Sequence, residues 1–176
     1  LSAEKVSWVT APVSADGVSH HVMRSVHAGT DISFHVLLPD GYSNSVRRYP
    51  VLYWLHGSGG GLPGIRPLAA FFRKGMATGE FPSMIIVFPN GLPYSMWCDS
   101  RDGKTPVESI FAKEIIPYID MSFRTIARSN GRIIEGFSIY RVATATDVTF
   151  ALVDGQTHTA TISAFTTTSV ATDADM

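Results

Sequence analysis

The sequence predicts an α/β fold built on a mostly parallel sheet. An unbroken apolar run at residues 51–55 has the length of a strand, and its continuous hydrophobicity indicates a strand covered on both faces. Residues 83–88 repeat this pattern, and residues 132–135 repeat it on a smaller scale after the turn Asn130-Gly131. Helical segments fill the gaps between them. The chain has 176 residues, of which 45% are hydrophobic and 16% are charged. This length and composition suit one domain with a sizeable core.

The N-terminal part begins with a predicted β-hairpin. Two β-branched, apolar-rich stretches, residues 18–26 and 32–38, are separated by the turn residues 28–31. The buried strand at 51–55 follows, and a helix over 66–78 leads to the strand at 83–88. This alternation of strand and helix is typical of right-handed crossovers onto one sheet.

A second helix is predicted from Pro106 to Ser122. Thr105 and Glu108 have capping-box spacing, and Pro106 occupies the favourable first helical position. Pro117 cannot donate to the carbonyl of Lys113, so we expect it to kink the helix. A stripe of apolar residues at helical spacing predicts one buried face: Val107, Ile110, Phe111, Ile115 and Ile119.

The composition changes after Ser138. Residues 141–176 hold ten Thr and seven Ala and no Lys or Pro. Two strands are predicted there, at 147–153 and 156–165, joined by the favoured hairpin turn Asp154-Gly155. We therefore divide the chain into an N-terminal part, residues 1–140, and an atypical tail, residues 141–176.

Charge and cysteine content exclude several classes of function. Fourteen Lys plus Arg against fifteen Asp plus Glu give a net charge of −1, which disfavours a nucleic-acid partner. No apolar run approaches the roughly 18 residues that cross a bilayer, so no membrane partner is expected. The single cysteine, Cys98, excludes an internal disulfide and is interpreted as a small buried hydrophobe. We predict no metal and no cofactor.

The sequence leaves the compartment open. No signal-peptide pattern lies in residues 1–31. That fits a cytoplasmic protein and equally a secreted or periplasmic one after processing.

The glycine-rich run His56–Gly61 directly follows a buried strand, and three interpretations of it are open. Gly59, Gly61 and Gly64 satisfy a dinucleotide-binding pattern, but Pro63 interrupts the helix start, which disfavours that interpretation. The run could also be only a tight connection. The third interpretation is an oxyanion loop of the His-Gly-Gly type found in esterases.

A second motif favours the oxyanion loop. Gly136-Phe137-Ser138 follows the strand at 132–135, where a nucleophile elbow would place its serine. In the full pattern G-x-S-x-G the last position is a glycine, because helix and strand backbones nearly touch there. Here that position is Tyr140, whose side chain does not suit the usual geometry.

These motifs occur in the order known from one family. Residues 49–57 resemble the oxyanion strand of the putative-esterase family of α/β-hydrolases, which includes esterase D (S-formylglutathione hydrolase), feruloyl and acetyl-xylan esterases and mycolyltransferases. Residues 85–91 resemble its next strand, 108–124 the helix before its nucleophile, and 131–138 its nucleophile strand. The resemblance covers about residues 30–138.

The resemblance implies an α/β-hydrolase-like sheet and a serine carboxylesterase acting on short-chain or aryl esters, of the feruloyl or acetyl type. It makes Ser138 the nucleophile and the backbone N–H groups of Ser58 and Ile139 the oxyanion donors. His56, Gly57 and Trp97 are then expected to lie against the substrate: the first two in the oxyanion loop, and Trp97 beside the acyl pocket.

The resemblance stops after Ser138, where family members continue with Met-Gly-Gly, a helix and a hundred or so further residues. The 38 residues that follow here contain one histidine, His158, and the order Ser138, Asp154, His158 is formally that of a catalytic triad. These three are the candidate catalytic residues, although His158 is expected on a hairpin strand. The alternative is a truncated, frame-shifted or recombined esterase scaffold that binds or associates with little turnover. We also expect an exposed sheet edge to make the chain a homo-oligomer.

Overall fold

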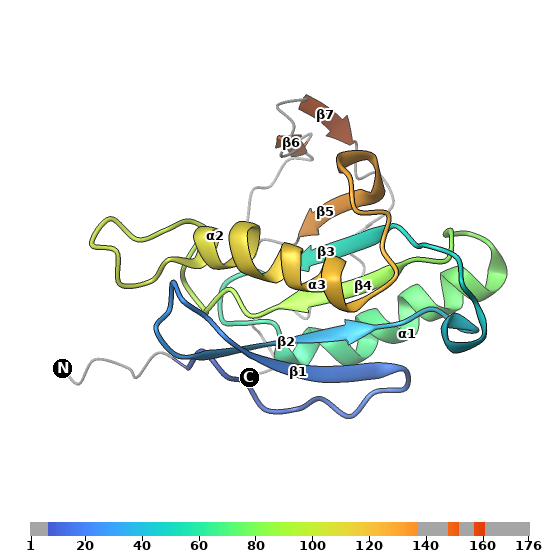
Figure 1. The fold of residues 1–176 in the computed structure, drawn as a ribbon, viewed down its shortest axis with the longest axis horizontal. Helices are drawn as coiled ribbons and strands as arrows, with labels where there is room; N and C mark the ends of the chain where they lie inside the picture. Colours follow the sequence, from blue (N-terminus) through green and yellow to red (C-terminus); the bar gives the residue numbers. More distant parts are fainter. Residues whose placement is uncertain (1–6, 137–147, 152–156, 161–176) are drawn as a thin grey trace, which may run out of the picture. The chain divides into compact units, whose positions relative to one another are not determined.

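The computed structural model describes residues 7–136, 148–151 and 157–160. The chain divides into two units, residues 1–139 and 140–176. In the first unit, the described strands form one mixed sheet in the order β1-β2-β4-β3-β5 (Figure 1). The strands are β1 Val18–Arg24, β2 Asp31–Leu37, β3 Val51–Leu55, β4 Ile85–Pro89 and β5 Arg132–Gly136.

The sheet confirms the predicted α/β class. β1 and β2 form the expected antiparallel hairpin, and β2 also pairs antiparallel with β4. The three strands predicted from continuous apolar runs are parallel, with β3 between β4 and β5. The middle strand therefore carries the His56–Gly61 loop at its carboxyl end.

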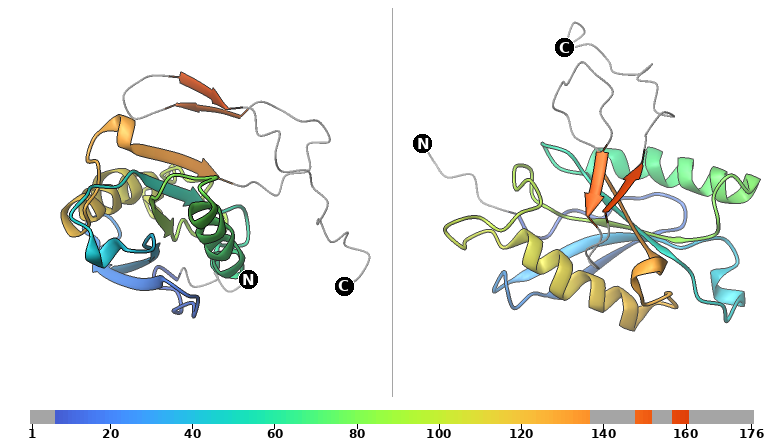
Figure 2. Two further views of the ribbon diagram at one scale, coloured as in Figure 1. Left: turned by 90° about the vertical axis from the view of Figure 1, so that its right-hand side faces the viewer. Right: turned by 90° about the horizontal axis from the view of Figure 1, so that it is seen from above.

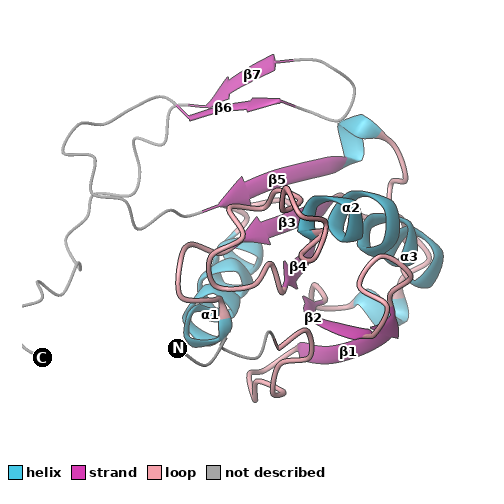
Figure 3. Cartoon of the chain, turned by 90° about the vertical axis from the view of Figure 1, so that its left-hand side faces the viewer, coloured by secondary structure: helices cyan, strands magenta, loops and turns pink. Residues whose placement is uncertain are grey.

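Helices cover both faces of the sheet (Figures 2 and 3). Helix α1, Leu62–Thr78, packs on one face against Leu52 and Trp54. The segments α2 Val107–Ile110, η2 Phe111–Ile115 and α3 Ile116–Ser122 cover the other face and bury the predicted apolar stripe. Two short 3₁₀ turns, η1 Tyr42–Asn44 and η3 Ser129–Gly131, precede β3 and β5. The core consequently lies in two layers, one on each side of the sheet.

The predicted capping box at the start of the second helix is wrong. Helix α2 begins at Val107, Pro106 stands before it, and no side chain of the predicted pair caps it. Asp99 acts there instead: its Oδ1 accepts the Ser109 N–H at 2.9 Å and its Oδ2 accepts the Ser109 hydroxyl at 2.7 Å. A carboxylate satisfies the N–H groups at a helix start better than a neutral hydroxyl does, because its negative charge also interacts favourably with the positive end of the helix dipole.

The predicted helix contains a wider turn directly before Pro117. The segment before it, Phe111–Ile115, is π-helical, and α3 begins at Ile116 with the proline in its first turn. A π turn shifts the hydrogen-bond register by one residue, which accommodates the missing proline N–H. The helix thus continues to Ser122 on one face of the sheet.

The second unit contains an antiparallel pair of strands, β6 Val148–Ala151 and β7 Thr157–Ala160. The paired residues lie within the two predicted hairpin strands, 147–153 and 156–165, whose other residues lie outside the described ones. The Asp154-Gly155 turn lies outside the described residues.

Within the described part of the chain, no helix is long and apolar enough to span a bilayer.

Candidate active site

The two motifs begin side by side at one edge of the sheet. β3 and β5 are parallel, and Leu55 at the end of β3 is the register partner of Gly136 at the end of β5. A Cβ added at Gly136 would lie 2.9 Å from the carbonyl oxygen of Leu55, so glycine permits this close approach. The chain leaves β3 into His56 and leaves β5 into the Phe137-Ser138 dipeptide.

The ring of His56 is fully occupied by hydrogen bonds to the backbone. Its Nδ1 donates to the Gly57 carbonyl at 2.8 Å, because a carbonyl can only accept, and its Nε2 accepts the Gly91 N–H at 3.0 Å. Burial lowers the pKa of His56, against the opposing effect of the bond to Gly57. The imidazole is therefore neutral and locked, and it joins the oxyanion loop to the loop after β4.

The loop after β4 makes two further contacts with the oxyanion loop. The Trp97 indole N–H donates to the His56 carbonyl at 2.9 Å, and the two rings are 5.0 Å apart. The Gly59 N–H donates to the Pro93 carbonyl at 3.0 Å. His56, Trp97 and these backbone groups hold the two loops together as one body.

Ser58 lies between these fixed points. Within the described residues, its N–H has no hydrogen-bond acceptor. Gly59 and Gly60 follow it with φ of 87° and 98°, a region that disfavours residues with a side chain. Among the described residues, the loop thus offers a backbone N–H without an acceptor at the carboxyl end of β3, and an oxyanion site requires such a group.

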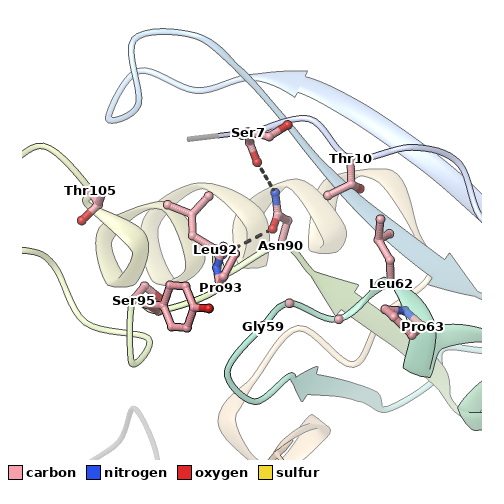
Figure 4. A pocket seen from close by; sticks show the side chains of 13 residues that line it. Ser7, Thr10, Gly59, Leu62, Pro63, Asn90, Leu92, Pro93, Ser95 and Thr105 are labelled. Carbon is pink, nitrogen blue, oxygen red and sulfur yellow. Dashed lines mark hydrogen bonds between the residues drawn. The ribbon is translucent and has the colours of Figure 1, made fainter. Parts of the chain in front are cut away.

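A pocket of about 630 Å³ opens beside this loop (Figure 4). Residues 59–63 form one wall, residues 92–95 form another, and Ser7 and Thr10 contribute from the N-terminal segment. The Asn90 amide donates to the carbonyls of Ser7 and Trp8, both at 3.0 Å, and so fastens that segment over the pocket. Asn90 is not among the candidate residues predicted from the sequence, although its position directly after a parallel strand next to β3 is typical of a binding residue.

The remaining candidate residues fall into two groups. Ser138, Ile139 and Asp154 lie outside the described residues, and of His158 only the backbone in β7 is described. Trp97 is described, and its ring contacts His56 and Phe111.

The loop at residues 97–103 contains Cys98 and two carboxylates, Asp99 and Asp102. The expectation that Cys98 is buried is wrong, because this residue is exposed. Asp99 accepts from Ser109 in α2, whereas Asp102 accepts from Ser100 and Lys104 within the loop. No group of three or more potential metal ligands occurs within the described part of the chain.

Comparisons with known proteins agree with this geometry. Residues 25–139 match the family described as Putative esterase. Esterase MT1326 of Mycobacterium tuberculosis (strain CDC 1551 / Oshkosh) is 36% identical over 114 residues, which cover 63% of this chain and 24% of that protein. The chain thus spans about a quarter of the length of the curated relative that it matches.

Solved structures share the fold. A ferulic acid esterase, 29% identical, superposes with a TM-score of 0.61 over 68% of this chain and 48% of its own. An S-formylglutathione hydrolase from Agrobacterium tumefaciens, 15% identical, superposes with a TM-score of 0.56 over 72% of this chain and 51% of its own. At that identity the second match shows the fold alone.

Proposed function

The chain belongs to the putative-esterase family, and from this premise we propose that it is a serine carboxylesterase that hydrolyses short-chain or aryl esters through an acyl-enzyme. One observation carries the proposal. Gly136 and Leu55 are register partners, so the Gly-Phe-Ser motif and the oxyanion loop leave the sheet at the same edge. A nucleophile and an oxyanion donor have to meet at one carbonyl, and this edge supports such a meeting.

In the proposed mechanism, the Ser138 hydroxyl attacks the ester carbonyl and loses its proton to a histidine. The N–H groups of Ser58 and Ile139 hold the oxygen that becomes negative, and each such donor contributes about 3 kcal/mol in comparable sites. The intermediate expels the alcohol, which takes up the proton, and water then releases the acid from the serine. We propose His158 as this base and Asp154 as its orienting carboxylate.

The pocket beside the loop supports an ester with an aryl or short acyl group. Its volume of about 630 Å³ lies within the usual range for small-molecule sites. Leu62, Leu92 and Tyr94 supply apolar lining, and an aryl ring gains most from such surface. Small polar groups, among them Thr10 and Ser95, offer hydroxyl partners for ring substituents.

The test compares hydrolysis of p-nitrophenyl acetate and methyl ferulate by the wild-type chain and three variants. We expect Ser138→Ala to abolish turnover and His158→Ala to reduce it comparably, because the triad acts as a unit. Ser43→Ala, an exposed serine in η1, is the matched control and should retain full activity.

Full activity in Ser138→Ala would refute the proposal. If Ser138→Ala abolishes turnover and His158→Ala does not, the role of His158 is wrong while the esterase assignment stands. A wild type without turnover of either ester points to the alternative of an esterase-derived scaffold.

A further inference from the structure

The loop after β4 adopts an unusual backbone. Leu92, Met96 and Trp97 have φ of 63°, 54° and 57°, and among the described residues these are the only non-glycine positions with positive φ. Such a conformation costs free energy in residues with a Cβ, and it persists only where the surroundings impose it. Tertiary contacts of this loop therefore hold these three residues in their conformation.

The side chain at the end of this strained run is Trp97, and its indole contacts both the oxyanion loop and the core. The ring lies 5.0 Å from the His56 ring and 6.0 Å from the ring of Phe111, which is buried in η2. Gly91 makes room for it, because a Cβ there would lie 2.5 Å from the indole carbons. The loop thus holds the Trp97 ring between Phe111 in η2 and His56, the first residue of the oxyanion loop.

The hydrogen bond of Trp97 acts on the backbone next to the oxyanion donor. Its N–H holds the carbonyl oxygen of His56, which fixes the plane of the peptide between His56 and Gly57. On the other side of Ser58, the Gly59 N–H is held by the Pro93 carbonyl. The Ser58 N–H lies between these two points, in a run whose glycines would otherwise allow several conformations.

We propose that Trp97 is a positioning residue: it acts through His56 to aim the Ser58 N–H at the developing oxyanion. This inference rests on the proposed function. Preorganised donors contribute most when they need no reorientation as charge develops. Loss of the indole bond should therefore slow the chemical step rather than weaken substrate binding.

The experiment uses Trp97→Phe, which keeps an aromatic ring and removes the N–H, and Gly91→Ala, which pushes the indole away from His56. Trp8→Phe is the matched control, since Trp8 is partly buried and its indole makes no hydrogen bond within the described residues. Two readouts are taken: kcat and KM for p-nitrophenyl acetate, and hydrogen–deuterium exchange of the Gly59 amide.

We expect both test variants to lower kcat by about tenfold with KM within twofold, since a whole oxyanion donor is worth roughly 100- to 1,000-fold. The Gly59 amide should exchange several-fold faster in both variants and unchanged in Trp8→Phe. An unchanged kcat, a rise in KM alone, or the same Gly59 exchange as in the control would overturn the inference. If the wild type shows no Ser138-dependent turnover, the proposed function fails, and the exchange measurement still decides the role of Trp97.

Discussion

Gly136→Ala is the substitution that probes the contact between the two strand ends most sharply. The added methyl group would lie 2.9 Å from the Leu55 carbonyl oxygen and 3.2 Å from its Cβ, and the closest neighbour is backbone that no rotamer change can move. Ordinary contact begins near 3.4 Å, so the end of β5 has to move away from β3 by roughly half an ångström. The Gly-Phe-Ser motif would move with it, away from the oxyanion loop.

This displacement has two measurable consequences. Overpacking of this kind costs about 1–3 kcal/mol of unfolding free energy. A misplacement of about 1 Å at a reacting centre costs roughly 100-fold in rate, so half of it should lower kcat/KM for p-nitrophenyl acetate by about tenfold.

The matched control is Gly64→Ala in the first turn of α1. There the new methyl group meets only Leu68 Cδ1, at 3.6 Å, and a helical position favours alanine. We expect this variant to keep its activity and to gain up to about 1 kcal/mol. A wild-type kcat/KM in Gly136→Ala would show that the two strand ends do not hold the Gly-Phe-Ser motif beside the oxyanion loop.

Three further predictions concern stability and association. Glu114 accepts hydrogen bonds from the Ser25 hydroxyl, two backbone N–H groups and the His27 ring. Burial alone would raise the pKa of Glu114, but these bonds outweigh it and lower the pKa. Glu114→Gln should therefore lower the free energy of unfolding, measured in urea at pH 7, by about 2–3 kcal/mol. This difference from the wild type should shrink as the pH falls below 4.5, because the wild-type carboxylate then becomes protonated. A difference that stays constant with pH would contradict this prediction. Burial, together with the nearby charge of His20, lowers the pKa of His35 to about 4, and its Nε2 accepts the Val13 N–H as a neutral ring does. The unfolded chain takes up this proton first, so unfolding free energy should fall by about 1–3 kcal/mol between pH 6.5 and 4, and a similar fall in His35→Gln would exclude His35 as the cause. Within the described sheet, β5 is the last strand and pairs only with β3, and its residue Ile133 is 41% exposed. We therefore propose that the chain self-associates through the unpaired side of β5. Sedimentation velocity at rising concentration should show a dimer or larger species, and a monomer throughout would exclude it.

The sheet was predictable because its signals are local. The continuous apolar runs at β3 and β4, the shorter Ile133-Ile134 pair in β5 and the turn residues between β1 and β2 each appear within a few positions of the sequence. Helix starts were less predictable. The carboxylate of Asp99 displaces the expected Thr105 cap from ten positions before Ser109, and sequence spacing near the helix shows nothing of this contact.

The candidate site was predictable in its position but less so in the roles of its residues. The loop after β3 and the serine motif after β5 follow from motif order along the chain. The roles of His56 and Trp97 depend on contacts between residues that are distant in the sequence. His56 contacts Gly91 and Trp97, which are 35 and 41 positions away, and Trp97 contacts Phe111, which is 14 positions away. Cys98 was taken as buried from residue type alone, whereas its loop leaves it exposed.

In the proposed function, Ser138 and the oxyanion loop form one nucleophilic site. The most direct measurement is mass spectrometry of the chain after reaction with a fluorophosphonate, with the adduct located by peptide mapping. We predict one adduct per chain, on Ser138, that is lost in Ser138→Ala and forms more slowly in Gly136→Ala. An adduct on another residue, or none while a reference serine esterase reacts fully in the same tube, would contradict the account.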